Sequence, residues 1–190
     1  MSKAFVGHAF VAIGSNLNGD LDSPASQVNR AFQSIANLPK TKLIKTSSLY
    51  QSAPFGYTDQ PDFTNAVAEI STQLAPEKLL AALLNIEIEA GRERPFANAP
   101  RVLDCDLLLY DEIKMATEKL TLPHPRMFER GFVLLPLAEI APHLTSPSGE
   151  SIVKLALSHQ NQGIKKLAWV FLINIPILWL KAQSAAEKPR

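Results

Sequence analysis

Two carboxylates stand two residues apart in the segment 101–110 (RVLDCDLLLY) and could bind a metal ion. Side chains alternate along a β-strand, so Asp104 and Asp106 would share one face, with Cα atoms roughly 6.5 Å apart. The other face would then hold apolar side chains alone: Leu103, Cys105, Leu107 and Leu109. Neighbouring carboxylates repel unless a cation separates them, and such hard oxygen ligands suit Mg²⁺ together with substrate phosphates. The segment by itself fits either a magnesium site or a strand with a solvated acidic face.

Three arginines, Arg92, Arg94 and Arg101, lie within ten residues just before this strand, and only Glu93 opposes them there. Guanidinium groups match phosphate oxygens in bidentate pairs. A basic loop that leads into the two aspartates therefore predicts a site for a magnesium nucleotide, the alternative being a solvated run of charges. The sequence contains neither GxxxxGK[ST] nor GxGxxG, which excludes a P-loop or Rossmann phosphate site.

Two further segments carry weaker candidates. His124 stands between two prolines, whose restricted backbone suits a ligand contact, and Arg130 could bind a phosphate. Asn65 and Phe63 share a face of a predicted strand, where an amide beside an aromatic ring could bind a flat heterocycle. The alternatives are a structural histidine, a surface arginine, a core phenylalanine and an amide at a strand edge.

Apolar periodicity and turn signals predict the elements that would position these side chains. Ser23 and Pro24 provide a helix cap and first turn, and Pro76 and Gly91 bound a second helix. The expected strands are 10–13, 43–50, 63–70 and 103–110, with a hairpin at 113–120 and a short helix around 133–140. Strand, helix, strand, strand, helix, strand is the order of a split βαβ motif. We therefore predict a ferredoxin-like α+β fold (βαββαβ), a mostly antiparallel sheet with helices covering one face.

Composition narrows the class of protein. Of 190 residues, 46% are hydrophobic and 19% are charged, so the chain can bury a sizeable core and is not disordered. Lys and Arg number 19 against 18 Asp and Glu, and the net charge of +1 predicts no general attraction to nucleic acid or to an anionic membrane. A lone cysteine excludes an internal disulfide and fits a cytoplasmic location.

The C-terminal end differs in composition from the rest of the chain. Residues 1–169 are expected to form the domain, and an apolar then basic tail of unknown role follows at 170–190. The apolar stretch 167–180 contains Pro176 and is shorter than the roughly 20 residues that a bilayer-spanning helix needs, so no transmembrane span is expected. No signal peptide is evident. We expect a monomer or weak homodimer, with the tail docked on the domain or on a second copy.

Taken together, the motifs resemble those of one family, 6-hydroxymethyl-7,8-dihydropterin pyrophosphokinase of folate biosynthesis. The resemblance runs from about residue 10 to residue 147, and the order and spacing of the motifs make it specific. The matching motifs are IGSNL at 13–17, SSLY at 47–50, DQPDFTN at 59–65, the segment 87–92, RVLDCD at 101–106, LPHP at 122–125 and RGFVL at 130–134. The family implies a ferredoxin-like fold and transfer of pyrophosphate from ATP to the pterin hydroxymethyl group, with release of AMP.

The resemblance also implies roles for the charged residues. Asp104 and Asp106 resemble the ligands of two Mg²⁺ ions that bridge the ATP phosphates and the pterin hydroxyl, so that no protein general base is needed. Arg92 and Arg101 would lie closest to the transferred group. Further contacts to ATP would come from two more arginines, Arg94 and Arg130, and from the backbone around Leu120 and Thr121, with His124.

For the pterin, the resemblance implies an amide contact at its edge and rings against its faces. Asn65 resembles the residue that hydrogen-bonds the edge, and Phe132, together with Phe63, would hold the faces. The rest of the pocket would be lined by the residues after the predicted strand 43–50: Ser52, Ala53 and Phe55.

The basic loop departs from the family pattern. Asn98 stands where some members carry a tryptophan that packs over bound ligands. Two other interpretations therefore stay open: a non-catalytic ferredoxin-like module that binds a nucleotide or a pterin, and an inactive relative. The two aspartates next to Arg92 and Arg101 favour the enzyme, because a binding module needs no paired metals.

Overall fold

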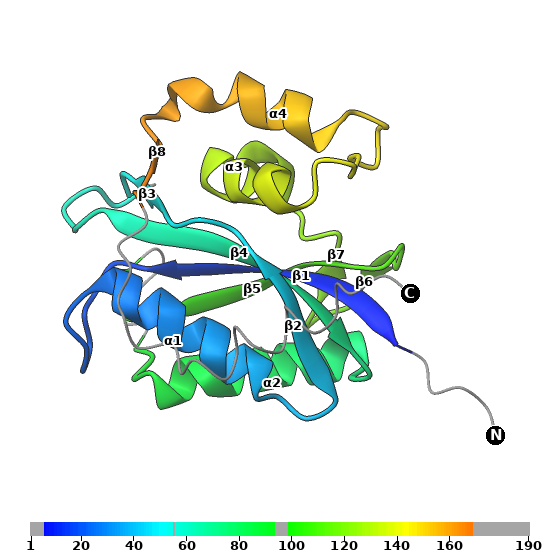
Figure 1. Cartoon of the computed structure of the whole chain (residues 1–190), viewed down its shortest axis with the longest axis horizontal. Coiled ribbons are helices and arrows are strands. Elements are labelled where there is room, and N and C mark those ends of the chain that lie inside the picture. Colours follow the sequence, from blue (N-terminus) through cyan, green and yellow to red (C-terminus); the bar gives the residue numbers. More distant parts are fainter. Residues whose placement is uncertain (1–5, 55, 94–98, 169–190) are drawn as a thin grey trace, which may run out of the picture.

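The computed structural model describes residues 6–54, 56–93 and 99–168, in which helices lie on both sides of one sheet (Figure 1). The strands are β1 (Gly7–Ser15), β2 (Thr41–Thr46), β3 (Tyr50–Ser52), β4 (Phe63–Thr72), β5 (Asp104–Tyr110), β6 (Met115–Ala116), β7 (Thr121–Leu122) and β8 (Lys165–Lys166). The α-helices are α1 (Pro24–Ala36), α2 (Pro76–Glu89), α3 (Gly131–Ile140) and α4 (Ile152–Ser158), and short 3-10 helices are η1 (Met127–Glu129) and η2 (Gln160–Gln162).

The main sheet is antiparallel, and β1 lies between β4 and the edge strand β5. β2 and β3 both pair with the other edge of β4, and β8 pairs with β3, so the order is β5-β1-β4-β3-β8 with β2 beside β4. This arrangement is a split βαβ motif, and it confirms the predicted ferredoxin-like α+β fold. β6 and β7 form the small hairpin expected at 113–120, although its second strand begins just after Leu120.

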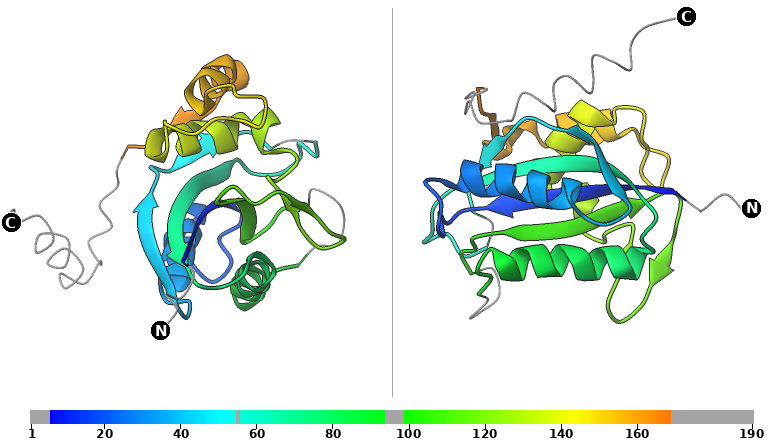
Figure 2. Two further views of the ribbon diagram at one scale, coloured as in Figure 1. Left: turned by 90° about the vertical axis from the view of Figure 1, so that its right-hand side faces the viewer. Right: turned by 60° about the horizontal axis from the view of Figure 1, so that its bottom comes forward.

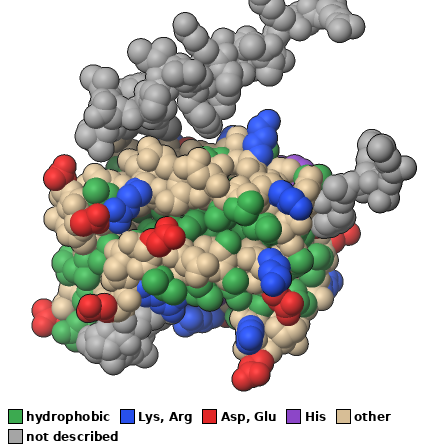
Figure 3. All heavy atoms as spheres, turned by 90° about the horizontal axis from the view of Figure 1, so that it is seen from below, with side chains coloured by type: hydrophobic (Ala, Val, Ile, Leu, Met, Phe, Trp, Pro, Cys, Tyr) green, Lys and Arg blue, Asp and Glu red, His purple; other side chains and the backbone are tan. Residues whose placement is uncertain are grey.

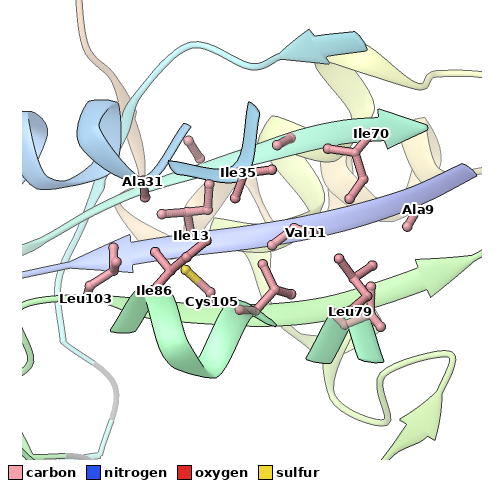
Figure 4. Close-up of a cluster of buried hydrophobic side chains, with 14 of the residues drawn as sticks. Ala9, Val11, Ile13, Ala31, Ile35, Ile70, Leu79, Ile86, Leu103 and Cys105 are labelled. Carbon is pink, nitrogen blue, oxygen red and sulfur yellow. The ribbon is translucent and has the colours of Figure 1, made fainter. Parts of the chain in front are cut away.

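α1 and α2 cover one face of the sheet, and their ends follow the predicted signals (Figure 1). The Ser23 hydroxyl accepts the Ser26 N–H at 3.2 Å, and Pro24 begins α1. α2 begins at Pro76 and ends where Gly91 adopts a φ of +87°, which glycine tolerates without strain. A core of buried side chains fills the space between these helices and the sheet (Figure 4), among them Val11, Ile13, Ile35, Ile70 and Leu79.

α3 packs on the opposite face of the sheet and α4 packs on the outer side of α3, as the two views in Figure 2 show. The prediction of helices on one face is therefore incomplete. β4 is buried without interruption from Thr64 to Ala68, so its side chains need cover on both sides. The second buried cluster joins the sheet to the two helices through Phe10, Val67, Leu108, Leu134, Leu137 and Ile152.

The predicted strand 43–50 is wrong in one respect, because it consists of two strands separated at 47–49. Ser47 donates its N–H to the Val67 carbonyl at 2.9 Å and accepts the Val67 N–H on its hydroxyl at 2.9 Å. The hydroxyl thus replaces a backbone acceptor, and the register against β4 shifts by one residue after this point. The shift sets Tyr50 opposite Asn65, a residue of the predicted site.

Because of a bulge in β5, the prediction that Leu109 shares a face with Leu103, Cys105 and Leu107 is wrong. β1 pairs with Leu107 and then with Leu109, so Leu108 has no residue opposite it. Alternation ends at the bulge: Leu107 is part of the α1–α2 core, whereas Leu109 packs with the cluster on the α3 side. Asp104 and Asp106 precede the bulge, so the alternation predicted for them holds.

Charged side chains of both signs are spread over the face that α1 and α2 form (Figure 3). Within the part of the chain that the structure describes, no helix is long and apolar enough to cross a bilayer. The tail 170–190 lies outside the described residues, so what was predicted for it stays a prediction.

Candidate active site

A cavity opens on the α3 side of the sheet, next to the end of β1 and the start of β5. Nine of the residues predicted from the sequence line it: Ser52, Ala53, Phe63, Asn65, Arg101, Asp104, Asp106, Arg130 and Phe132. Seven that were not predicted complete its wall: Ala12, Ile13, Gly14, Gln60, Ala66, Arg126 and Val133. The fold thus brings together strands, loops and a helix start that are distant in the sequence.

The two aspartates face open space because the strand beside them carries small residues. In the pairing of β1 with β5, Gly14 is opposite Asp104 and Ala12 is opposite Asp106. Larger side chains at these two positions of β1 would fill the space next to the carboxylates. The sequence contained this signal in the alternation of small residues with Ile13, but only the strand pairing shows what it leaves room for.

Arginines surround the aspartates. Arg101 Nη1 lies 2.7 Å from Asp104 Oδ2, and Arg130 Nη1 lies 3.6 Å from Asp106 Oδ2. Burial, and then the nearby charge of Arg126, hold the pKa of Arg130 below its ordinary value. Such crowding of cations favours an anionic ligand, because an anion would relieve their mutual repulsion.

The two guanidinium groups are also held against aromatic rings. The central carbon of Arg101 lies 5.6 Å from the centre of the Phe63 ring, and that of Arg130 lies 5.6 Å from the Phe132 ring. Arg101 Nε is buried and has no hydrogen-bond partner among the described residues. A buried donor in this state costs free energy, and a phosphate oxygen would satisfy it.

Arg92 does not line the cavity, and a buried carboxylate holds it. Arg92 Nη1 lies 2.6 Å from Glu87 Oε2, and the Glu87 side chain is 2% exposed. The other oxygen of Glu87 accepts the Cys105 N–H at 2.7 Å. Glu87 thereby ties Arg92 to the strand position between the two aspartates. The sequence analysis assigned it no role, although it lies in one of the matching motifs.

Asn65 lies across β1 from Asp104. Gly14 pairs with both residues, so their backbones are roughly 10 Å apart, two strand spacings. Asn65 Nδ2 donates to Ser52 Oγ at 2.9 Å and to the Tyr50 carbonyl at 3.4 Å, which fixes the plane of the amide. A fixed amide beside the Phe63 ring can bind the edge of a flat heterocycle.

Asn16 connects two segments that border the cavity, and the sequence analysis did not identify it. Its Oδ1 accepts the Arg101 N–H at 2.8 Å, and its Nδ2 donates to Gln60 Oε1 at 2.9 Å and to the Pro61 carbonyl at 3.1 Å. These bonds tie the approach to β5 and the loop before β4 to the end of β1. The IGSN motif marks the position, but nothing local in the sequence names the partners.

The remaining predicted residues are placed less directly. His124 Nε2 lies 4.0 Å from Asp106 Oδ2, and burial lowers the pKa of this histidine although the Asp106 charge opposes the shift. Leu120 belongs to the α1–α2 core and Thr121 is exposed on β7, so neither lines the cavity. Three residues lie outside the described parts of the chain: Phe55, Arg94 and Asn98.

The cavity-lining carboxylates that could hold a metal ion are those of the two aspartates. Cys105, which stands between them, is buried on the other face, and burial raises the pKa of its thiol. In the residues that the structure describes, no group of three or more His, Cys, Asp or Glu side chains could hold a metal ion. A pair of carboxylates fits Mg²⁺, which usually takes one or two carboxylates and completes its shell with phosphates and water.

Sequence comparison relates the chain to one family. The model of a family described as 7,8-dihydro-6-hydroxymethylpterin-pyrophosphokinase (HPPK) matches residues 10–142. The 2-amino-4-hydroxy-6-hydroxymethyldihydropteridine pyrophosphokinase of Haemophilus influenzae is 44% identical over 159 residues, which cover 84% of this chain and 97% of that protein. The protein of the same name from Pseudomonas aeruginosa is 43% identical over 158 residues, covering 83% of this chain and 95% of that protein.

Structural comparison agrees on the fold. A crystal structure of Plasmodium falciparum HPPK-DHPS with pteroate superposes with a TM-score of 0.63 at 14% sequence identity. The match covers 84% of this chain and 43% of that one, so the chain spans less than half of the longer protein. At this identity the likeness supports the architecture of the domain and no more.

Proposed function

The chain belongs to the 7,8-dihydro-6-hydroxymethylpterin-pyrophosphokinase family, and on this premise we propose that the cavity on the α3 side of the sheet is its active site. The reaction transfers pyrophosphate from ATP to the hydroxymethyl group of 6-hydroxymethyl-7,8-dihydropterin in folate biosynthesis. One observation carries the site: Asp104 and Asp106, with their arginines, lie across β1 from Asn65 in the same cavity. The phosphates fit the charged β5 side and the pterin fits the β4 side.

Asp104 and Asp106 would hold Mg²⁺, and the family resemblance implies two ions. The hard oxygen atoms of these side chains, and the space that Gly14 and Ala12 leave beside them, fit a divalent cation that also binds phosphate. Bound there, Mg²⁺ supplies positive charge to the phosphates and favours ionisation of the attacking hydroxyl. No side chain of the protein then has to act as a general base.

The arginines would bind and orient the phosphates. Arg101 has a buried donor without a partner in the described chain, and its contact with Phe63 holds the guanidinium at the cavity wall. Arg92 is held at the edge of the site by Glu87, from which it could approach the transferred group. The other contacts to ATP that the resemblance implies remain part of the proposal: Arg94, Leu120, Thr121, His124 and Arg130.

On the β4 side, Asn65 and Ser52 would orient the pterin edge, with the amide fixed by the bond between them. Phe63 and Phe132 line the cavity and would hold the two faces of the ring. Ala53 lines the same part of the wall, and Phe55 is proposed from the resemblance alone.

AMP is the expected nucleotide product, because the family transfers pyrophosphate rather than a single phosphate. The chain is incubated with ATP, Mg²⁺ and 6-hydroxymethyl-7,8-dihydropterin, and the nucleotides are separated by chromatography. AMP should form in step with loss of the pterin. ADP formed in step with loss of the pterin would refute pyrophosphate transfer. If neither AMP nor ADP forms when the pterin is present, the non-catalytic module or the inactive relative is favoured.

Phe132→Ala is expected to weaken pterin binding far more than ATP binding, because Arg130, which lies 5.6 Å from the Phe132 ring, is one of several proposed ATP contacts. Stacking of a flat heterocycle on an aromatic ring contributes about 1–3 kcal/mol, so the pterin dissociation constant should rise about 5- to 140-fold. Phe128→Ala is the matched control, because Phe128 packs in the same cluster on the α3 side but does not line the cavity. Equal losses of pterin affinity in Phe132→Ala and Phe128→Ala would show that Phe132 does not contact the pterin.

We infer a cytoplasmic location, which agrees with a single buried cysteine. We also infer a monomer or weak homodimer, and a domain boundary near residue 169. The experiments above do not depend on any of them.

A further inference from the structure

The segment 159–167, called the brace below, lies against two elements that carry different walls of the proposed pterin site. It follows α4 and contains η2 and β8. In Figure 1, α4 runs along the outer side of α3, and β8 leads from it to β3. Phe132, near the start of α3, and Ser52, at the end of β3, line two walls of the proposed pterin site. The brace contacts both α3 and β3 and so connects these two walls.

The first contact is at the start of α3. Gln162 Oε1 accepts the Gly131 N–H at 3.2 Å, whereas Arg130, the capping residue of α3, makes no side-chain capping bond. A Cβ at Gly131 would lie 2.7 Å from Gln162 Oε1 and 2.8 Å from Ile164 Cδ1. The brace therefore occupies the space of a side chain at position 131, which is the position between Arg130 and Phe132.

The second contact is at the other end of α3. Lys166 Nζ lies 3.2 Å from Glu139 Oε1. Glu139 also accepts the Tyr50 O–H at 2.8 Å and the Ser48 O–H at 2.8 Å. Burial acts to raise the pKa of Glu139, but the hydrogen bonds from Tyr50 and Ser48 outweigh it and keep the pKa below its ordinary value. A charged carboxylate thus joins α3, β3 and the brace.

The third contact is with β3 itself. Lys166 pairs with Tyr50, and the Leu167 N–H donates to the Leu49 carbonyl at 2.8 Å. Tyr50 is in turn opposite Asn65 on β4. β3 has 3 residues and β8 has 2, so neither strand has many ladder bonds of its own. β3 is also held by its pairing with β4 and by the bonds of Tyr50 and Ser48 to Glu139, and the brace adds contacts that join β3 to both ends of α3.

We propose that the brace sets the spacing between the Phe132 wall and the Asn65 wall and thereby determines the affinity for the pterin. This inference rests on the proposed function, because it takes these two walls as the pterin site. Gln162 and Lys166 are positioning residues, since they act on the ligand through α3 and β3. ATP bound near Asp104 and Asp106 depends less on that spacing, because Arg130 is the proposed ATP contact that adjoins Gly131, whereas the two aspartates and Arg101 belong to β5 and the loop before it.

The test uses the full chain and measures the pterin dissociation constant in the presence of a non-hydrolysable ATP analogue. Gln162→Ala combined with Lys166→Met should raise that constant about fivefold, the effect of losing one or two hydrogen bonds. The dissociation constant of the ATP analogue alone should change much less. Lys165→Met is the matched control, because neighbouring side chains of a strand point to opposite faces. Gln162→Glu, which keeps an acceptor for the Gly131 N–H, should retain wild-type affinity.

Gly131→Ala is the second variant, because its new Cβ must push aside the ends of the Gln162 and Ile164 side chains, through which the brace contacts the start of α3. It should also weaken pterin binding more than binding of the ATP analogue. If both variants keep wild-type pterin affinity while Phe132→Ala loses it, the proposal that the brace determines pterin affinity is wrong. The proposed function is then unaffected. Equal losses for both ligands with a lower unfolding midpoint also overturn the proposal for the brace, since the segment would then only stabilise the fold. A wild-type chain that binds no pterin and makes no AMP refutes the proposed function instead.

Discussion

Turnover is expected to fall at least about 1,000-fold when Asp104 or Asp106 is replaced by asparagine, because loss of a metal ligand removes several kcal/mol of transition-state stabilisation. Asparagine keeps the size of the side chain and removes the charge that would bind Mg²⁺. The Asp106 side chain is 36% exposed, and neither aspartate belongs to the buried core. The free energy of unfolding should therefore change by less than about 1 kcal/mol. Initial rates at saturating ATP and pterin, with urea unfolding of each variant, measure both effects.

Asp111→Asn is the matched control, since Asp111 directly follows β5 and bonds the His8 N–H at 2.9 Å, away from the cavity. It should keep wild-type turnover. Chelation of divalent cations should abolish turnover of the wild-type chain, and added Mg²⁺ should restore it. Near-normal turnover of either site variant at saturating Mg²⁺ would contradict the metal site.

The part of the site that the sequence predicted is the part that depends on local geometry. Asp104 and Asp106 share a face because two residues are one period of a strand, whatever the strand pairs with. Ser23, Pro76 and Gly91 set helix ends for reasons that also lie within a few residues. Periodicity and caps are therefore sufficient for the main strands, the two long helices and the two carboxylates.

What escaped prediction depends on contacts between distant segments. The bulge beside Leu108 arises from the pairing of β1 with β5, and it moves Leu109 to the other cluster. The break at Ser47 arises from a bond to Val67 on another strand. Asn16 and the brace are defined by partners that no spacing in the sequence reveals.

The family resemblance supplied what local patterns could not. It named Phe132 as a pterin contact and Arg130 as a phosphate contact, and the structure places both in one cavity with the aspartates. It also named Leu120 and Thr121, which the structure places outside that cavity. A motif transfers the identity of a residue, whereas the contacts of that residue have to be read from the fold.

Glu87→Ala is expected to destabilise the fold more than any other single change at the site. The variant leaves the Cys105 N–H buried without its acceptor and Arg92 without its carboxylate. Removal of one partner of a buried ion pair costs about 3–5 kcal/mol, and the partial exposure of Arg92 places the expected loss near about 3 kcal/mol. The loss should be measured as a lower urea midpoint with an unchanged slope. Turnover should also fall, because Arg92 is no longer held beside the strand of the aspartates.

A double-mutant cycle separates the pair from its surroundings. Arg92→Met removes the cation and leaves the Glu87 charge buried, so it should destabilise the fold as well. Glu87→Gln keeps an oxygen for the Cys105 N–H, and combined with Arg92→Met it leaves no unpaired charge. The losses of unfolding free energy in Glu87→Gln alone and in Arg92→Met alone are added together. The double variant should lose less than this sum, by at least about 1 kcal/mol. Additive losses would show that Glu87 and Arg92 act independently, and Arg92 would then need another explanation for its position at the site.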